Sequence, residues 1–213
     1  MIDVPSAAPS GPELLWWPES GIGYFPVDQA LGVYDEGYWQ KYIGYDTSPM
    51  GRRLARARVE LVARHYPRGL ALIDVGIGAG GFILARSEGG DPTFGSDVNP
   101  TALAWLEARG LRRDPEHATF PHALSFWDCL EHIPEPGPML AQADAVFVSL
   151  PLFEGPEHIL RSKHFRRDEH CWYFTRAGLI RFFERHGFEC AEHNTAETLI
   201  GREDISSFAF LRR

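Results

Sequence analysis

The feature that most constrains this chain is a run of glycines directly after an apolar segment. Residues 72–82 read LIDVGIGAGGF, so the apolar residues end at an acid and the glycines follow before an apolar pattern resumes. This order predicts a strand, a tight turn and a helix, because glycine lets the backbone turn sharply and lets a ligand approach closely. Free amides at the helix start offer donors to polar ligand atoms. We therefore expect a cradle for a nucleotide-sized cofactor rather than a turn without a ligand.

Two classes of cofactor fit this turn. Gly76, Gly78 and Gly81 satisfy the dinucleotide pattern G-x-G-x-x-G, whereas Asp74, Gly76, Gly78 and Gly80 satisfy D-x-G-x-G-x-G. The Asp74 carboxylate would repel a pyrophosphate but suits the ammonium group of a methionine. With this acid the run resembles motif I of class I S-adenosylmethionine-dependent methyltransferases.

A second acid follows at the interval expected for ribose binding. Residues 92–97 read as a short strand that ends at Asp97, 23 residues after Asp74. Doubly wound folds place an acid near this interval for ribose hydroxyls, which both nicotinamide and methionine cofactors carry. Methyltransferases usually place a third strand and adenine contacts next, but residues 110–122 show no clear strand. We assign no adenine contact there.

A polar cluster follows the next predicted strand. Residues 123–134 read ALSFWDCLEHIP, so Asp128, Glu131 and His132 fall at positions i, i+3 and i+4 after an apolar run that ends at Trp127. If a helical turn begins there, the three groups share one face at the ligand-binding edge of the sheet. The string resembles the fourth-strand signature of the small-molecule group that includes ubiquinone-type O-methyltransferases.

Three roles stay open for these residues. His132 or a neighbouring acid can take a proton from an acceptor hydroxyl or amine. Alternatively, the two carboxylates and the imidazole can bind a divalent metal that holds a diol. In the third interpretation, Glu131 and His132 anchor the turn and have no chemical role.

The segment 152–174 holds several further polar groups. His158, His164, Asp168, His170 and Cys171 match no zinc-binding spacing, so we expect a substrate-facing loop there rather than a metal cluster. Residues 169–189 resemble the C-terminal region of the same methyltransferase group, in which a histidine precedes an aromatic strand and a helix that ends at Gly-Phe. His170 is therefore a second candidate for the pocket.

The N-terminal part is rich in aromatic residues. Residues 1 to about 30 have no helical or strand period, although we expect parts of them to pack on the domain or over its ligand. Tyr34, Tyr38, Tyr42 and Tyr45 then follow the spacing of one helix face. That helix either docks on the core or forms a lid over the pocket. We divide the chain into two parts. Residues 1–48 form a tail and an aromatic helix that act as a cap or lid, and residues 49–213 form the S-adenosylmethionine-binding methyltransferase domain.

Composition narrows the class of protein. The chain has 213 residues, of which 44% are hydrophobic and 23% charged, as in ordinary globular proteins. No run approaches the roughly 20 apolar residues of a membrane span, and no signal peptide is evident, so we expect a cytoplasmic protein without a membrane partner. Cys129, Cys171 and Cys190 are too few and scattered for a disulfide framework. The net charge of −8 argues against nonspecific binding along nucleic acid, although the arginine-rich stretch 161–167 leaves nucleotide or nucleic-acid acceptors open.

The expected fold is α/β: a Rossmann-like, doubly wound, mostly parallel sheet with an antiparallel last strand and an aromatic-rich N-terminal cap. The expected function is transfer of a methyl group from S-adenosylmethionine to the oxygen or nitrogen of a small-molecule acceptor. The alternatives are an NAD-dependent oxidoreductase and a non-catalytic S-adenosylmethionine-binding module. The resemblance implies a set of cofactor-binding residues, namely Asp74, Gly76, Gly78, Gly80, Phe82, Asp97, Val98, Trp127 and Asp128. The catalytic candidates are His132, His170, Asp128 and Glu131.

Overall fold

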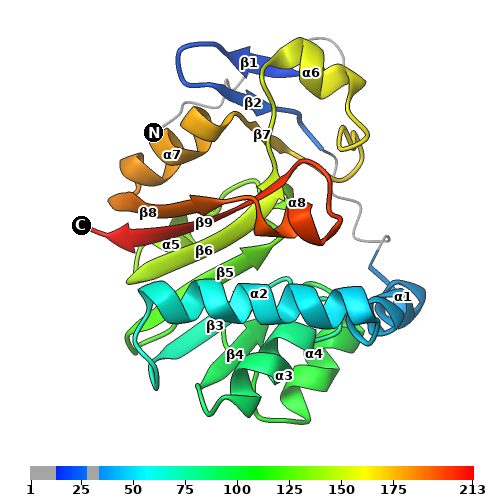
Figure 1. Cartoon of the computed structure of the whole chain (residues 1–213), viewed down its shortest axis with the longest axis vertical. Coiled ribbons are helices and arrows are strands. Elements are labelled where there is room, and N and C mark those ends of the chain that lie inside the picture. The colour runs from blue at the N-terminus through cyan, green and yellow to red at the C-terminus, as the bar shows by residue number, and fades with distance from the viewer. Residues whose placement is uncertain (1–12, 28–33) are drawn as a thin grey trace.

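The computed structural model describes residues 13–27 and 34–213, which form a central six-stranded sheet flanked by helices (Figure 1). The strand order is β4-β3-β5-β6-β9-β8; the pairs from β4 to β6 are parallel, and β9 runs antiparallel to both β6 and β8. The strands are β3 (Ala71–Val75), β4 (Thr93–Ser96), β5 (His122–Trp127), β6 (Ala145–Pro151), β8 (Phe188–Asn194) and β9 (Ile205–Arg212). The predicted doubly wound sheet with an antiparallel last strand is confirmed.

Two of the longer helices begin at a capping residue followed by proline. Ser48 accepts a hydrogen bond from Gly51 N–H before Pro49 at the start of α2, and Asn99 caps α4 before Pro100 in the same way. The longer helices are α1 (Glu36–Asp46), α2 (Pro49–His65), α3 (Gly81–Glu88), α4 (Pro100–Glu107) and α7 (Arg176–Arg185). Shorter turns are η1 (Leu130–His132), α5 (Gly137–Leu140), α6 (Pro156–Arg161) and α8 (Ala196–Ile200).

Alternating strand residues build a core on each face of the sheet. On one face Leu72 and Phe147 pack with Leu61 and Val62 of α2. On the other face, residues such as Phe126 pack with α5 and α7, whose contributions include Leu140, Leu179, Phe182 and Phe183. Burying both faces leaves only the ends of the strands to carry polar chemistry.

The structure adds strands that the sequence does not predict. β1 (Leu15–Trp17) and β2 (Ile22–Tyr24) form a small antiparallel sheet with β7 (Trp172–Phe174), which lies beside α6 at one end of the molecule (Figure 1). The expectation that this part of the N-terminal segment has no strand is therefore wrong. These strands are three residues long, too short for a period of two to be detectable. Ile22 and Phe25 are buried, which confirms that part of the segment packs on the domain.

The segment after α4 forms no third parallel strand. Its contact with the outer edge of β4 is a single bridge between Gly95 and Arg112. The absence of a clear strand in 110–122 is confirmed.

Within residues 13–27 and 34–213, every helix is too short or too polar to span a lipid bilayer.

Candidate cofactor and acceptor site

A cavity of about 270 Å³ opens at the carboxyl ends of β3, β4 and β5. Its walls combine the glycine turn, the strand ends, the first turns after β5 and the tyrosines of α1. The lining residues are Val27, Tyr34, Tyr38, Tyr42, Val75, Gly76, Gly78, Ser96, Asp97, Val98, Trp127, Asp128, Cys129, His132, Ile133, Pro134, Met139, Asp168 and Glu169. Most of the wall is apolar, and the few polar groups are concentrated at the strand ends, as in typical ligand pockets.

The glycine turn meets its neighbours too closely for side chains. Gly76 has φ +75°, and a Cβ there would lie 2.5 Å from the Cys129 Sγ. Gly78 has φ +56°, and a Cβ there would lie 3.1 Å from the Tyr42 ring. These positions therefore need glycine both for their backbone conformation and for the close packing of the cavity wall.

Asp97 closes the glycine turn from the neighbouring strand. Its Oδ2 accepts a hydrogen bond from Ile77 N–H at 2.8 Å, and its Oδ1 accepts one from Asn99 N–H at 2.8 Å. Burial raises the pKa of Asp97, although the backbone donors oppose that effect. The carboxylate thus holds the turn and also lines the cavity.

Asp74 lies one layer below the cavity. It is 1% exposed and accepts a hydrogen bond from the Ser125 hydroxyl at 2.6 Å. Burial raises its pKa to about 8. Three of the predicted cofactor residues, Asp74, Gly80 and Phe82, do not line the cavity, whereas Gly76, Gly78, Asp97, Val98, Trp127 and Asp128 do.

The aromatic residues of helix α1 lie in two different environments, the cavity and the packed interface with α4. Tyr34, just before α1, and Tyr38 and Tyr42 within it line the cavity, with Tyr38 and Tyr42 ring centroids 4.6 Å apart. Trp39, between them, is buried beside Trp105 of α4. The tyrosines of the predicted helix face therefore line the pocket, while Trp39 docks the helix on the core. At the C-terminal end of α1, Asp46 accepts a hydrogen bond from Gly81 N–H at 2.9 Å, which joins the helix to the glycine turn.

Asp128 belongs to a network of two acids and two arginines. Its carboxylate accepts hydrogen bonds from Arg202 at 2.6 and 2.8 Å and from Arg58 at 3.2 Å. Both arginines also contact Glu197, which is 1% exposed. Burial opposes ionisation of Asp128, but Arg202 and Arg58 outweigh it, so the pKa of Asp128 lies below its usual value.

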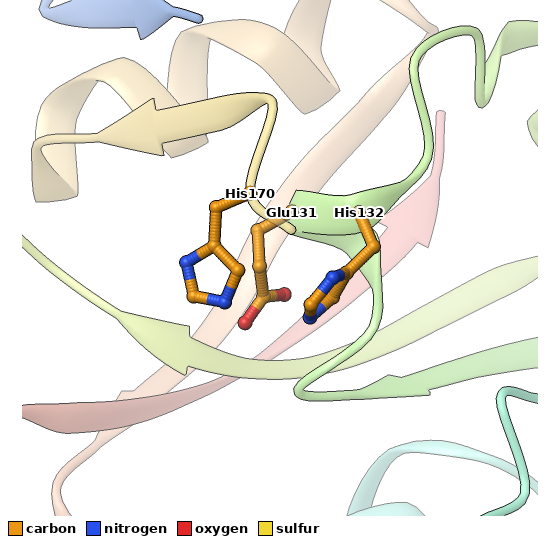
Figure 2. A group of neighbouring side chains, drawn as sticks. All are labelled: Glu131, His132 and His170. Atoms are coloured by element: carbon orange, nitrogen blue, oxygen red, sulfur yellow. The ribbon is translucent and has the colours of Figure 1, made fainter. Parts of the chain in front are cut away.

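Glu131 and His132 have different neighbours from Asp128. Asp128 has φ +54° and precedes the 3₁₀ turn η1, so the expectation that Asp128, Glu131 and His132 share one helical face is wrong. Instead, Glu131 and His132 lie with His170 from the segment before β7, and ligand atoms of the three residues lie within 4.8 Å of one another (Figure 2). The rings of His132 and His170 are 4.5 Å apart and nearly perpendicular.

The surroundings of this cluster disfavour charge. Burial, together with the charge of Asp128, raises the pKa of Glu131 to about 8. Burial, followed by the neighbouring His132, lowers the pKa of His170 to about 3. His132 lines the cavity, whereas Glu131 and His170 lie behind it. Of the other polar groups in 152–174, only His170 joins this cluster among the described residues.

Sequence reasoning missed the partners of Asp128. Arg58 lies on the apolar face of α2 between Leu54 and Leu61, so an arginine within a buried stripe was the available signal. Arg202 and Glu197 pair with each other locally, but their other partners, Asp128 and Arg58, lie far away in the chain and leave no signal in this segment.

The family model described as "Methyltransferase domain" matches residues 21–193. Among curated proteins, none matches this sequence.

Solved structures share the fold at low sequence identity. A 1,6-didemethyltoxoflavin-N1-methyltransferase from Burkholderia thailandensis is 17% identical, with a TM-score of 0.57 and coverage of 92% of this chain and 98% of that one. The magnesium protoporphyrin IX methyltransferase from Synechocystis PCC 6803 with bound SAH is 15% identical, with a TM-score of 0.58 and coverage of 83% and 93%. A putative methyltransferase in complex with the Trm112 activator of Haloferax volcanii is 13% identical, with a TM-score of 0.60 and coverage of 83% and 96%.

The family model covers most of the chain, and the strand order, the glycine turn and the cavity agree with it. The chain therefore belongs to this methyltransferase family and is a class I S-adenosylmethionine-dependent methyltransferase.

Proposed function

We propose that the enzyme methylates an oxygen or nitrogen atom of a small acceptor with a flat ring. The observation that carries this proposal is that the same cavity is lined by the glycine turn and by Tyr34, Tyr38 and His132. Aromatic side chains favour flat, polarisable ligands, because rings stack or meet edge to face. The related enzymes described above include one solved with bound 1,6-didemethyltoxoflavin and S-adenosylhomocysteine, which supports a small acceptor.

The cofactor occupies the side of the cavity nearest the strands in this proposal. The six predicted residues that line the cavity contact S-adenosylmethionine, with Asp97 at the ribose. Asp74, Gly80 and Phe82 do not line the cavity and act as positioning residues for those that do. Asp74 stabilises the end of β3 through Ser125.

Trp127 offers a donor that suits the cofactor. Its indole Nε1 is buried and has no hydrogen-bond partner among the described residues. Phe82 meets the ring edge to face at 5.1 Å, and the Arg58 guanidinium lies 5.0 Å from its centroid. A buried donor without a partner costs stability, so an acceptor atom of the bound cofactor is a fitting partner for this N–H.

Methyl transfer needs little beyond alignment. The acceptor lone pair forms a bond to the methyl carbon while the carbon–sulfur bond breaks and its electron pair stays on sulfur, leaving S-adenosylhomocysteine. Holding the nucleophile, the methyl carbon and sulfur in line supplies most of the rate. His132 is the catalytic candidate that both lines the cavity and carries a group suited to an acceptor hydroxyl or amine.

Calorimetry tests the cofactor part of the proposal. We expect S-adenosylmethionine and S-adenosylhomocysteine to bind with one site per chain, and NAD not to bind. Binding of NAD without binding of either methionine derivative would overturn the assignment.

Turnover tests the catalytic part. A panel of phenols, catechols and aromatic amines is incubated with the enzyme, and S-adenosylhomocysteine formation is measured. We expect one class to be methylated, and His132→Ala to lower kcat at least about tenfold while leaving S-adenosylhomocysteine affinity unchanged. His117→Ala is the control, because His117 is exposed and pairs with Asp114 outside the cavity. Tight cofactor binding without turnover of any acceptor would favour the non-catalytic module.

A further inference from the structure

The cluster of Glu131, His132 and His170 has the composition of a metal site. Its three side chains come from two separate segments, η1 and the approach to β7, and Figure 2 shows the Glu131 carboxylate between the two imidazole rings. Ligand atoms bound to one ion at about 2.1 Å in a tetrahedral site lie about 3.4 Å apart. The present spread of up to 4.8 Å therefore has to narrow through side-chain rotations when an ion binds.

Two of the three residues bury polar atoms without partners. Glu131 is 1% exposed, and its Oε2 has no hydrogen-bond partner among the described residues. His170 is 5% exposed, and its Nδ1 likewise has none in the described part of the chain. No salt bridge between described residues includes Glu131. A carboxylate buried in this way is costly unless a cation compensates it.

His132 is held in an orientation that suits a ligand. Its Nδ1 lies 3.0 Å from the backbone carbonyl oxygen of Glu169. A carbonyl only accepts, so the proton lies on Nδ1 and the lone pair lies on Nε2. Metal-binding histidines commonly donate their other N–H to a carbonyl in this way, which fixes the tautomer and the ring orientation.

The backbone joins the two segments that supply the ligands. Cys171 N–H donates to the Glu131 carbonyl oxygen at 2.8 Å, and the Cys171 thiol donates to the same oxygen at 3.2 Å. Trp172 Nε1 donates to the Ile133 carbonyl oxygen at 2.9 Å. These bonds fix His170 beside η1, so the three side chains are already positioned before an ion binds.

We propose that Glu131, His132 and His170 bind one divalent transition-metal ion of the zinc, cobalt or iron type. Two imidazoles and one carboxylate favour such ions over magnesium or calcium, which prefer oxygen ligands. Asp128 is not a ligand, because its carboxylate is engaged by Arg58 and Arg202. The ligand set leaves coordination positions open for a further group.

The position of the proposed metal site suggests which group fills the open coordination positions of the ion. His132 lines the cavity beside Tyr34 and Glu169. Given the proposed methyl transfer, the ion binds the acceptor hydroxyl, lowers its pKa and holds its oxygen toward the methyl group. The released proton passes to solvent, and the substrate class narrows to acceptors that chelate, such as catechols. His132 then serves as a ligand rather than as the proton acceptor.

Ion binding is tested on the whole chain, without methyl transfer. After removal of metals with EDTA, Co²⁺ is titrated by visible absorption, and Zn²⁺ and Mg²⁺ are then added as competitors. We expect one Co²⁺ per chain, displacement by Zn²⁺ but not by Mg²⁺, and at least about tenfold weaker binding in Glu131→Gln and His170→Asn. His117→Asn, which alters an exposed histidine beside Asp114, should bind Co²⁺ as the native chain does.

Thermal unfolding separates lost binding from lost folding. Without metal, Glu131→Gln should be about as heat-stable as the native protein, because glutamine has the shape of glutamate and brings no charge into this buried place. With Zn²⁺ the native midpoint should rise, since an ion that binds only the folded state stabilises it, whereas that of the variant should not. Equal Co²⁺ binding by the native chain and both cluster variants, or loss of binding in His117→Asn alone, would mean adventitious binding and overturn the proposal.

Cofactor binding and turnover distinguish this inference from the function on which it rests. S-adenosylhomocysteine should bind equally well with and without EDTA, while methylation of a catechol should fall at least about tenfold on chelation and recover with Zn²⁺ or Co²⁺. Turnover that is indifferent to EDTA would overturn the metal's role and leave the methyltransferase intact. Failure to bind S-adenosylhomocysteine would instead overturn the proposed cofactor site, while the Co²⁺ titration would still decide on the ion.

Discussion

Asp74 lies in β3 and Asp97 directly follows the neighbouring strand β4, but the two acids have different surroundings. Asp97 accepts two backbone N–H groups at the cavity wall, whereas Asp74 is buried below it with the Ser125 hydroxyl as its hydrogen-bond donor. Burial raises the pKa of Asp74 to about 8. The folded state therefore keeps a proton that the unfolded chain, with a pKa of about 3.9, releases at lower pH.

Stability should consequently fall as the pH rises from about 4 to 8, since the unfolded state binds fewer protons in this window. Asp74→Asn keeps the shape of the side chain and removes this dependence. The unfolding free energies of Asp74→Asn and the native chain are measured in urea without cofactor. Relative to the native chain, the unfolding free energy of the variant should rise by at least about 1 kcal/mol between pH 5 and pH 8. The exposed Asp144→Asn is the control, and parallel pH profiles for Asp74→Asn and the native chain would contradict the prediction.

Trp127 permits a second test at the level of a single atom. Trp127→Phe keeps an aromatic ring against Phe82 but removes the buried indole N–H. We expect calorimetry to show S-adenosylhomocysteine binding weakened by roughly threefold to tenfold, the value of one hydrogen bond. Unchanged affinity would show that the N–H does not contact the cofactor.

Among the elements, α1 shows how one helix serves two purposes. Tyr38 lines the cavity, whereas the next residue, Trp39, packs beside Trp105 and is 6% exposed. Tyr38→Ala should raise the KM of the acceptor and change the unfolding free energy by less than about 1 kcal/mol. Trp39→Ala should instead lower the unfolding free energy by about 3 kcal/mol, because it leaves a large cavity.

Each substitution serves as the control for the other. Steady-state kinetics and urea unfolding are measured on both proteins. If both changes affect stability alone, the tyrosine face has no part in binding the acceptor.

Local patterns were sufficient for the elements with a strong period or a clear turn. The glycine run 72–82 predicted β3 and the start of α3 within a few residues. β1 and β2 escaped prediction because three-residue strands depend on their pairing with the distant β7. Secondary structure that is stabilised by remote partners leaves little trace in its own sequence.

The same contrast applies to the site. His132 and Asp97 follow directly from motifs, and both line the cavity. The separation of Asp128 from Glu131 depends instead on the positive φ of Asp128 and on Arg58 and Arg202. Those arginines lie 70 and 74 residues from Asp128 in the chain, so no spacing rule within one segment could reveal them.

For the whole molecule, the network of Arg58, Asp128, Glu197 and Arg202 connects distant parts of the chain. Glu197→Gln leaves two arginines facing Asp128 alone in a largely buried place. We expect this change to lower the unfolding free energy by about 2–4 kcal/mol, since an incompletely paired charge stays buried.

An exposed ion pair provides the comparison. Glu157 pairs with Arg161 at 3.7 Å, and the Glu157 side chain is 89% exposed. Glu157→Gln should change the unfolding free energy by no more than about 0.5 kcal/mol. Similar effects of Glu157→Gln and Glu197→Gln in urea unfolding would show that the network contributes no more than a surface pair.

The arginine network also has a consequence for biosynthesis. Asp128 is made 74 residues before Arg202, which donates to both of its carboxylate oxygens and is the last member of the network to be made. The edge of the sheet that carries the cavity therefore cannot reach its final charge balance until translation has passed residue 202. A nascent chain halted earlier contains the complete glycine turn but lacks the arginine that donates to both carboxylate oxygens of Asp128, so this network is completed only late in synthesis.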